Sequence, residues 1–146
     1  MTEAEKLVAQ FKDDLTTRGS TIKTSQLIDV ALDWAVAECE GLLGFGYRDD
    51  MGLLRIILST DEDEYFIPSL DWSHGGPIIG REEIGVTKPV GSLAWVATMQ
   101  YQNDDYDIIY QGEEQGTTPL IAAMRCYVAS KMGDEVEVPN KLLQGE

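Results

Sequence analysis

The segment from Thr118 to Gly133, TPLIAAMRCYVASKMG, limits the fold more than any other part of the chain. Thr118 is a favoured N-cap residue, Pro119 suits the first helical position, and Gly133 ends the pattern. At about 100° per residue, one sector of this helix carries four apolar side chains: Ile121, Met124, Val128 and Met132. The sequence therefore predicts a C-terminal helix with a buried stripe.

A second amphipathic helix is predicted at the N-terminus, over residues 2–18. Apolar residues follow helical spacing there, and Thr2 with Glu5 has the pattern of a capping box. We expect this helix to end near Gly19.

A third helix is predicted over residues 26–40. Thr24 or Ser25 would cap its start, and Gly41 would end it. Its apolar stripe consists of Ile28, Ala31, Leu32, Ala35 and Cys39, and its solvent face of Asp29, Asp33 and Glu40.

The remaining segments favour strands. Residues 53–67 predict a hairpin, and residues 93–101 predict a strand that pairs with residues 107–110 across the acidic turn QNDDY. We also expect a short extended piece at 21–25, a glycine-rich loop at 42–50 and an edge strand at 136–138 before a frayed end. This order of elements predicts an α+β domain in which helices flank a small, mainly antiparallel sheet.

The charge of the chain limits its partners. With 146 residues one domain is expected, and the formal net charge of -15 would repel a phosphate backbone. Direct binding to nucleic acid is therefore not expected, although an array of carboxylates could imitate a duplex. No apolar run approaches the length of a membrane span, and no signal core opens the chain, so we expect a cytoplasmic protein.

Few residues offer catalytic or metal chemistry. Cys39 and Cys126 lie in apolar helical patterns without a Cys/His cluster, so we expect free thiols, no metal and no cofactor. The common catalytic motifs are absent, and His74 is the only imidazole. An enzyme is less expected than a binding protein.

The segment DWSHGGPIIGREE, residues 71–83, is the first candidate site. If a short helix begins at Gly76-Pro77 and ends at Gly85, its first N–H groups are open to an anion. Arg81 would add charge, and the tryptophans at 34, 72 and 95 would add aromatic surface. The alternative is that Asp71 or Ser73 caps a helix whose tryptophans belong to the core.

Arg125 is the second candidate. On the C-terminal helix it lies only about 40° from Ile121, at the edge of the buried stripe. A guanidinium in that position needs a partner, either a carboxylate such as Asp71 or an anionic ligand. An internal ion pair and a ligand contact both remain open.

Three blocks carry a family resemblance: LIDVALDWAVAECEG (27–41), DWSHGGPIIGREEI (71–84) and TTPLIAAMRCYVASKMGDEVEVP (117–139). They resemble the small phage and prophage proteins of the NinX type, a family classed as a domain of unknown function. The resemblance spans about residues 22–142 of a single domain, 1–146. Residues 1–20 would be an N-terminal helical extension, and the stretch near 45–67 an insertion. The layout is also distantly similar to the phage α-β-α sandwich domain, which implies a sandwich-like fold.

The resemblance bears on the first candidate site. Glutamine is usual in the family where this chain has His74, and glutamate is usual where it has Gly80, so proton transfer by His74 is doubtful. The positions that match the family are Asp71, Trp72, Gly75, Gly76, Pro77 and Arg81. The resemblance implies a phage accessory protein that modulates or counters the host, and brings no known activity.

Three functions follow as hypotheses. In the first, a non-enzymatic accessory protein binds a small anionic or nucleotide-like ligand and sequesters a host defence signal. The binding residues would be Trp34, Asp71, Trp72, His74, Gly75, Gly76, Arg81 and Arg125. In the second, an acidic inhibitor or DNA mimic acts on a host nuclease or DNA-binding protein. The third is a small hydrolase that uses His74 or a desolvated carboxylate. Small accessory proteins of this kind often form homo-oligomers, and the sequence leaves the oligomeric state open.

Overall fold

The computed structural model describes residues 2–6, 19–42, 46–59 and 62–143. Residues 3–6 are helical, and the capping box at their start is confirmed: Thr2 Oγ1 accepts the Glu5 N–H at 3.1 Å and donates to Glu5 Oε1 at 3.1 Å. The rest of the predicted N-terminal helix, residues 7–18, lies outside the described residues.

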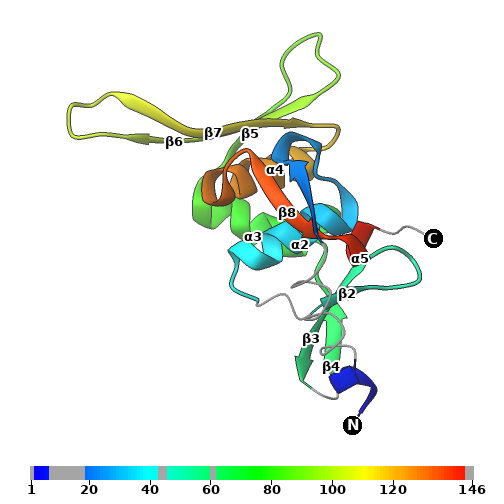
Figure 1. Ribbon diagram of the computed structural model, residues 1–146. Coiled ribbons are helices and arrows are strands. Elements are labelled where there is room, and N and C mark those ends of the chain that lie inside the picture. The colour runs from blue at the N-terminus through cyan, green and yellow to red at the C-terminus, as the bar shows by residue number, and fades with distance from the viewer. Residues whose placement is uncertain (1, 7–18, 43–45, 60–61, 144–146) are drawn as a thin grey trace.

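The elements alternate between helices and short antiparallel strands (Figure 1). In order they are β1 (Gly19–Lys23), the 3-10 helix η1 (Thr24–Gln26), α2 (Asp29–Cys39), β2 (Gly46–Arg48), β3 (Leu54–Ser59), β4 (Glu62–Tyr65), α3 (Trp72–Glu82), β5 (Gly85–Thr87), β6 (Trp95–Gln102), β7 (Ile108–Gly116), α4 (Pro119–Met132), β8 (Glu135–Pro139) and α5 (Asn140–Leu143). The strands pair in the orders β1-β8, β2-β3-β4 and β5-β6-β7. The predicted α+β class is confirmed.

Helix α4 forms the centre of the core. Its predicted cap is confirmed, since Thr118 Oγ1 accepts the Ile121 N–H at 3.1 Å. The helix packs on β6 and β7 on one side and on α2 on another. Two glycines of β7 permit this close packing: a Cβ added at Gly116 would lie 2.6 Å from Ala122 N, and one at Gly112 would lie 3.3 Å from Cys126 O.

Helix α2 differs from its prediction in two respects. It begins at Asp29 without a side-chain cap; Thr24 instead lies in η1, where its Oγ1 donates to Gly133 O at 2.6 Å. The predicted solvent face is wrong at Asp33, which is 1% exposed, because residues 30–37 are covered on all sides. Asp33 Oδ1 accepts the Ser69 N–H at 2.8 Å. Burial raises the pKa of this carboxyl to about 7, despite that hydrogen bond.

The strand predictions are largely confirmed. The hairpin over residues 53–67 and the edge strand at 136–138 are present as β3-β4 and β8. Three segments correct the sequence analysis. Part of the predicted loop at 42–50 forms β2, residues 85–87 form β5, and α5 replaces the expected frayed end because Leu142 is buried.

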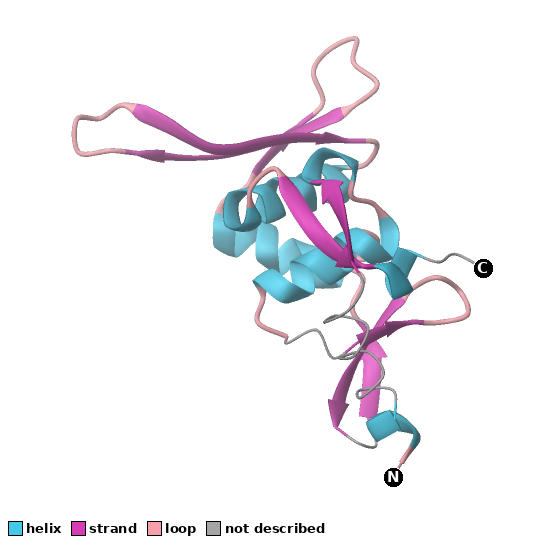
Figure 2. Cartoon of the chain, viewed as in Figure 1, coloured by secondary structure: helices cyan, strands magenta, loops and turns pink. Residues whose placement is uncertain are grey.

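The hairpin of β6 and β7 projects from the helical body (Figures 1 and 2). Its base packs on α4, whereas its far half extends beyond that helix. The turn between the strands is held by Asn103, whose Oδ1 accepts the N–H groups of Asp105 and Asp107, both at 2.9 Å. We call residues 100–109 the arm.

The close approach of β7 to α4 predicts a graded effect of added methyl groups. Gly116→Ala should lower the free energy of unfolding by ~1–3 kcal/mol, because its Cβ would overlap backbone of α4. Gly112→Ala should cost less. Gly80→Ala is the matched control: its Cβ meets nothing within 4 Å, so stability should rise by ~0.5–1 kcal/mol. Urea denaturation measures all three, and equal losses at Gly116 and Gly80 would contradict the packing.

Burial of Asp33 predicts an unusual dependence of stability on pH. The folded state favours the protonated carboxyl, so the contribution of Asp33 to stability is full below its ordinary pKa of 3.8 and is lost as the pH rises to about 7. Asp33→Asn cannot ionise and keeps the acceptor for Ser69 N–H. The free energy of unfolding of Asp33→Asn minus that of the unsubstituted protein should therefore grow by ~2 kcal/mol or more from pH 4.5 to pH 8, because one pKa unit corresponds to about 1.4 kcal/mol. Urea denaturation at both pH values tests this, and a pH-independent difference would refute it.

Candidate functional site

Helix α3 does not begin at Gly76-Pro77, as the sequence predicted, but at Trp72. Asp71 is its N-cap, as the alternative interpretation had it: Oδ1 accepts the Ser73 N–H at 2.8 Å and the Ser73 hydroxyl at 2.7 Å. These hydrogen bonds hold the pKa of Asp71 below its usual range. Pro77 lies inside the helix, which ends at Glu82 rather than at Gly85, with Glu83 as the C-cap at φ 55°.

Of the two glycines, Gly75 serves packing. A Cβ at Gly75 would lie 2.5 Å from Pro68 O and 2.7 Å from Leu120 Cδ2, so only glycine lets α3 approach this backbone and α4. The N–H of Gly75 donates to Asp71 O at 2.9 Å within the first turn. Gly76 is in the second turn of the helix, so its N–H is not one of the open donors at the N-terminus.

His74 is a structural acceptor. Its Nδ1 accepts the Ile67 N–H at 3.0 Å, and its ring stacks on Phe66 with centroids 5.9 Å apart. The imidazole thus fixes the segment that leads from β4 into α3. The amide oxygen of a glutamine at this position could accept the same N–H.

Arg81 is paired within the fold. Its Nη1 and Nη2 donate to the two carboxylate oxygens of Glu40 at 3.1 and 2.6 Å, and its Nε donates to Glu82 at 2.8 Å. The Tyr127 hydroxyl also donates to Glu40, at 2.5 Å. Partial burial acts to raise the pKa of Glu40, but the hydrogen bonds from Arg81 and Tyr127 hold it below its usual value. This network joins the ends of α2 and α3 to α4.

The partners of Arg125 in the described part of the chain are backbone carbonyls rather than Asp71. Its Nε donates to Leu27 O and its Nη1 to Gln115 O, each at 2.8 Å. Burial lowers the pKa of Arg125, and the charge of Glu114 opposes that effect. Arg125 also lines a hollow of about 480 Å³ together with Glu113 and Glu114.

The proposed site residues are therefore dispersed. No described residue of the 71–81 segment lines the hollow beside Arg125. Trp34 is buried in α2, whereas Trp72 is exposed at the start of α3. Binding of an anionic ligand at these residues stays a prediction.

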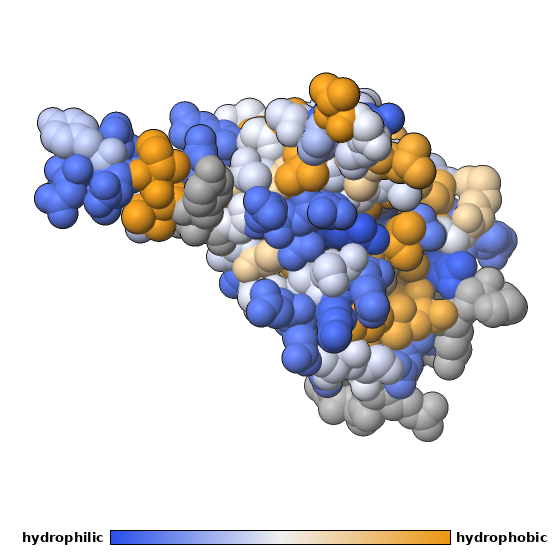
Figure 3. All heavy atoms as spheres, turned by 90° about the horizontal axis from the view of Figure 1, so that it is seen from above, coloured by the Kyte–Doolittle hydropathy of each residue, from blue (hydrophilic) through white to orange (hydrophobic). Residues whose placement is uncertain are grey.

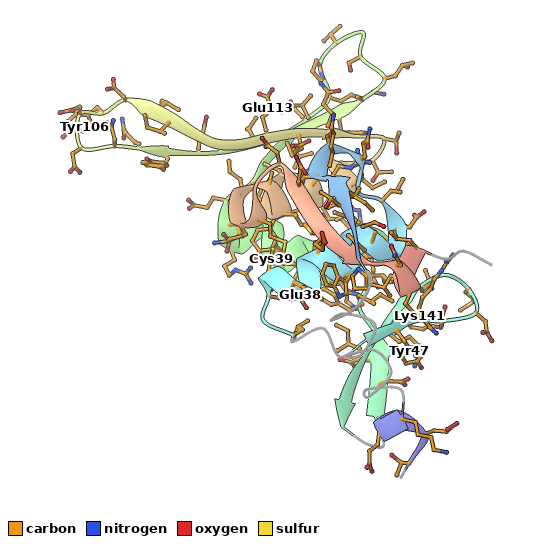
Figure 4. All side chains as sticks on the ribbon, in the orientation of Figure 1. Glu38, Cys39, Tyr47, Tyr106, Glu113 and Lys141 are labelled. Atoms are coloured by element: carbon orange, nitrogen blue, oxygen red, sulfur yellow. The ribbon has the colours of Figure 1, made fainter. Side chains whose placement is uncertain are left out.

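The arm is a surface that the sequence analysis did not single out. At its far end Tyr106 is 79% exposed, and Tyr101 and Ile108 are also exposed (Figure 4). Asp104, Asp105 and Asp107 are exposed in the same segment of the chain. In the view from above, the arm is mostly hydrophilic and carries one apolar patch (Figure 3). The signal in the sequence was the scarcity of apolar residues between Gln100 and Asp107, which leaves this part of the hairpin nothing to bury.

A comparison with known families supports the resemblance carried by the three sequence blocks, which contain α2, α3 and α4. The family model described as Bacteriophage P22, NinX matches residues 23–131. The chain belongs to this NinX family. A search of curated proteins gave no match for this NinX protein. Within the ranges described above, none of its helices is long and apolar enough to cross a bilayer.

The contact of His74 with Ile67 predicts which substitutions this NinX protein tolerates. His74→Gln should leave the free energy of unfolding nearly unchanged, because the amide keeps an acceptor for the Ile67 N–H. His74→Leu should lose ~1–2 kcal/mol, because that N–H loses its partner. Chemical denaturation compares the two, and equal losses would show that the hydrogen bond contributes nothing.

Proposed function

We propose that this NinX protein is a non-enzymatic phage protein that binds and inhibits a host protein with a basic surface, using the arm as its contact element. The observation that carries the proposal is the exposed set of Tyr101, Tyr106 and Ile108 on a projecting acidic hairpin. Aromatic side chains beside solvated charges are typical of protein interfaces, where they supply most of the binding energy.

The end of the arm is ordered before any partner binds. Asn103 fixes the turn through its side chain, and Gln102 Nε2 donates to Tyr106 O at 3.1 Å. Tyr106 has a φ of 66°, in the left-handed region, and its ring is left in solvent. A preformed contact element loses less conformational entropy on binding, which supports its use as a recognition surface.

Electrostatics select the class of partner. The net charge of -15 attracts a basic surface, and Asp104, Asp105 and Asp107 concentrate that charge at the arm. Proteins that bind nucleic acid carry such basic surfaces, so a host nuclease or DNA-binding protein fits the proposal. A small anion is favoured less, because Arg81 and Arg125 already donate to groups of the fold.

The proposal predicts which variants lose a host partner. In pull-downs from host lysate, the double variant Tyr106→Asn, Ile108→Ser should lose the retained protein, since asparagine keeps the left-handed turn but removes the ring. The control Val90→Ser, Leu93→Ser removes similar exposed apolar surface from the loop before β6 and should retain it.

The charge of the arm is tested separately. Replacing Asp104, Asp105 and Asp107 by asparagine should slow association with the captured protein by about tenfold at low salt, because electrostatic steering is lost. Surface plasmon resonance at two salt concentrations measures this rate. An identical set of captured proteins for the unsubstituted chain and the Tyr106 double variant would overturn the proposed function.

A further inference from the structure

A hollow of about 390 Å³ lies where the start of α2, the turn between β2 and β3, and α5 meet. These three elements are close neighbours on the side of the body away from the arm (Figure 1). We call this hollow the socket. None of the arm residues lines it.

Large apolar side chains form much of the wall of the socket although they stand in solvent. Ile28, Met51, Leu70 and Leu143 are between 37% and 69% exposed, and all four line it. They come from four separate segments of the chain. Exposed apolar groups that converge on one hollow mark a binding site more strongly than the same groups scattered singly.

Two carboxylates lie in the same wall. Asp33 is almost fully buried, with Oδ1 accepting the Ser69 N–H, and it still lines the socket. Asp29 lies one turn before it on α2 and is exposed, with its backbone in the left-handed region at φ 55°. Burial raises the pKa of Asp33, and the like charge of Asp29 adds to that effect. Arg48 also lines the socket, with its guanidinium over Gly52 of the turn.

This combination suits a long side chain with a cationic end. Methylene groups would lie against the apolar wall, and the cation would reach the carboxylates of Asp29 and Asp33. A guanidinium fits better than an ammonium, because it is less strongly hydrated and its planar fork matches a carboxylate. We infer that the socket binds an arginine side chain presented by a partner protein, as a second protein-binding site that is independent of the arm.

The test uses the full chain and N-acetyl-arginine N-methylamide as the probe, followed by backbone amide NMR. Titration should shift the signals of residues 28–33, 48–53 and 142–143, and not those of the arm. The citrulline analogue has nearly the same shape without the charge, and the norleucine analogue keeps only the apolar stem. Both should bind at least about tenfold more weakly, since each lacks the charge-assisted hydrogen bonds.

Variants separate the socket from the general negative charge of the protein. Asp33→Asn and Asp29→Asn should each weaken binding of the arginine probe by about tenfold. Asparagine keeps the acceptor for Ser69 and tolerates the left-handed backbone at position 29, so both variants should fold. Asp104→Asn with Asp105→Asn removes at least as much charge from the arm and should leave the affinity unchanged.

Three outcomes would overturn the inference: no shifts in the socket, equal binding of the citrulline analogue, or equal weakening by the arm variant. None of these outcomes would contradict the proposed function, which depends on the arm and a captured host protein. Loss of capture by the arm variant, in turn, leaves the arginine titration unaffected. A lysine probe that binds more tightly than the arginine probe would also contradict the assignment.

Discussion

The close packing of α4 against β7 is the constraint on which the rest of the structure depends. Gly112 and Gly116 remove the side chains that would hold the strand away, so backbone approaches backbone and the sheet covers one side of the helix. Helix α2 covers another side, and Gly75 brings in α3 at Leu120. Most of α4 is buried in this way, and buried polar side chains need partners within the protein.

That requirement explains why both cationic candidates have partners within the fold. Arg125 reaches from α4 to the carbonyl groups of its neighbours, and Arg81 closes the network of Glu40 and Tyr127 where three helices meet. Both guanidinium groups therefore stabilise the packing of helices. The acidic residues remain largely in solvent, so the exterior favours basic protein surfaces over phosphate-bearing ligands.

The two surfaces proposed for binding are built differently. The arm is a hairpin that extends past the helix on which it is anchored (Figure 1), and its exposed rings are close in sequence to exposed carboxylates. The socket is a concave site assembled from segments that are distant in sequence, with Asp33 buried in its wall. A protein with both surfaces can hold two parts of one partner, or two partners, at once. Burial of Asp33 disfavours its ionised form and lowers stability near neutral pH, and a bound arginine would offset that cost.

The sequence by itself determined α4 with its Thr118 cap, the β3-β4 and β6-β7 hairpins, the α+β class and the acidic surface. Local rules of capping, periodicity and turn chemistry decide these features. Only the tertiary structure decided that Asp33 is buried, that Asp71 rather than Gly76 opens α3, and that Arg125 bonds to Leu27 and Gln115. Periodicity reveals one buried face of a helix. Whether a second face is also buried depends on which elements pack around the helix. The same packing decides which carbonyl lies within reach of a guanidinium.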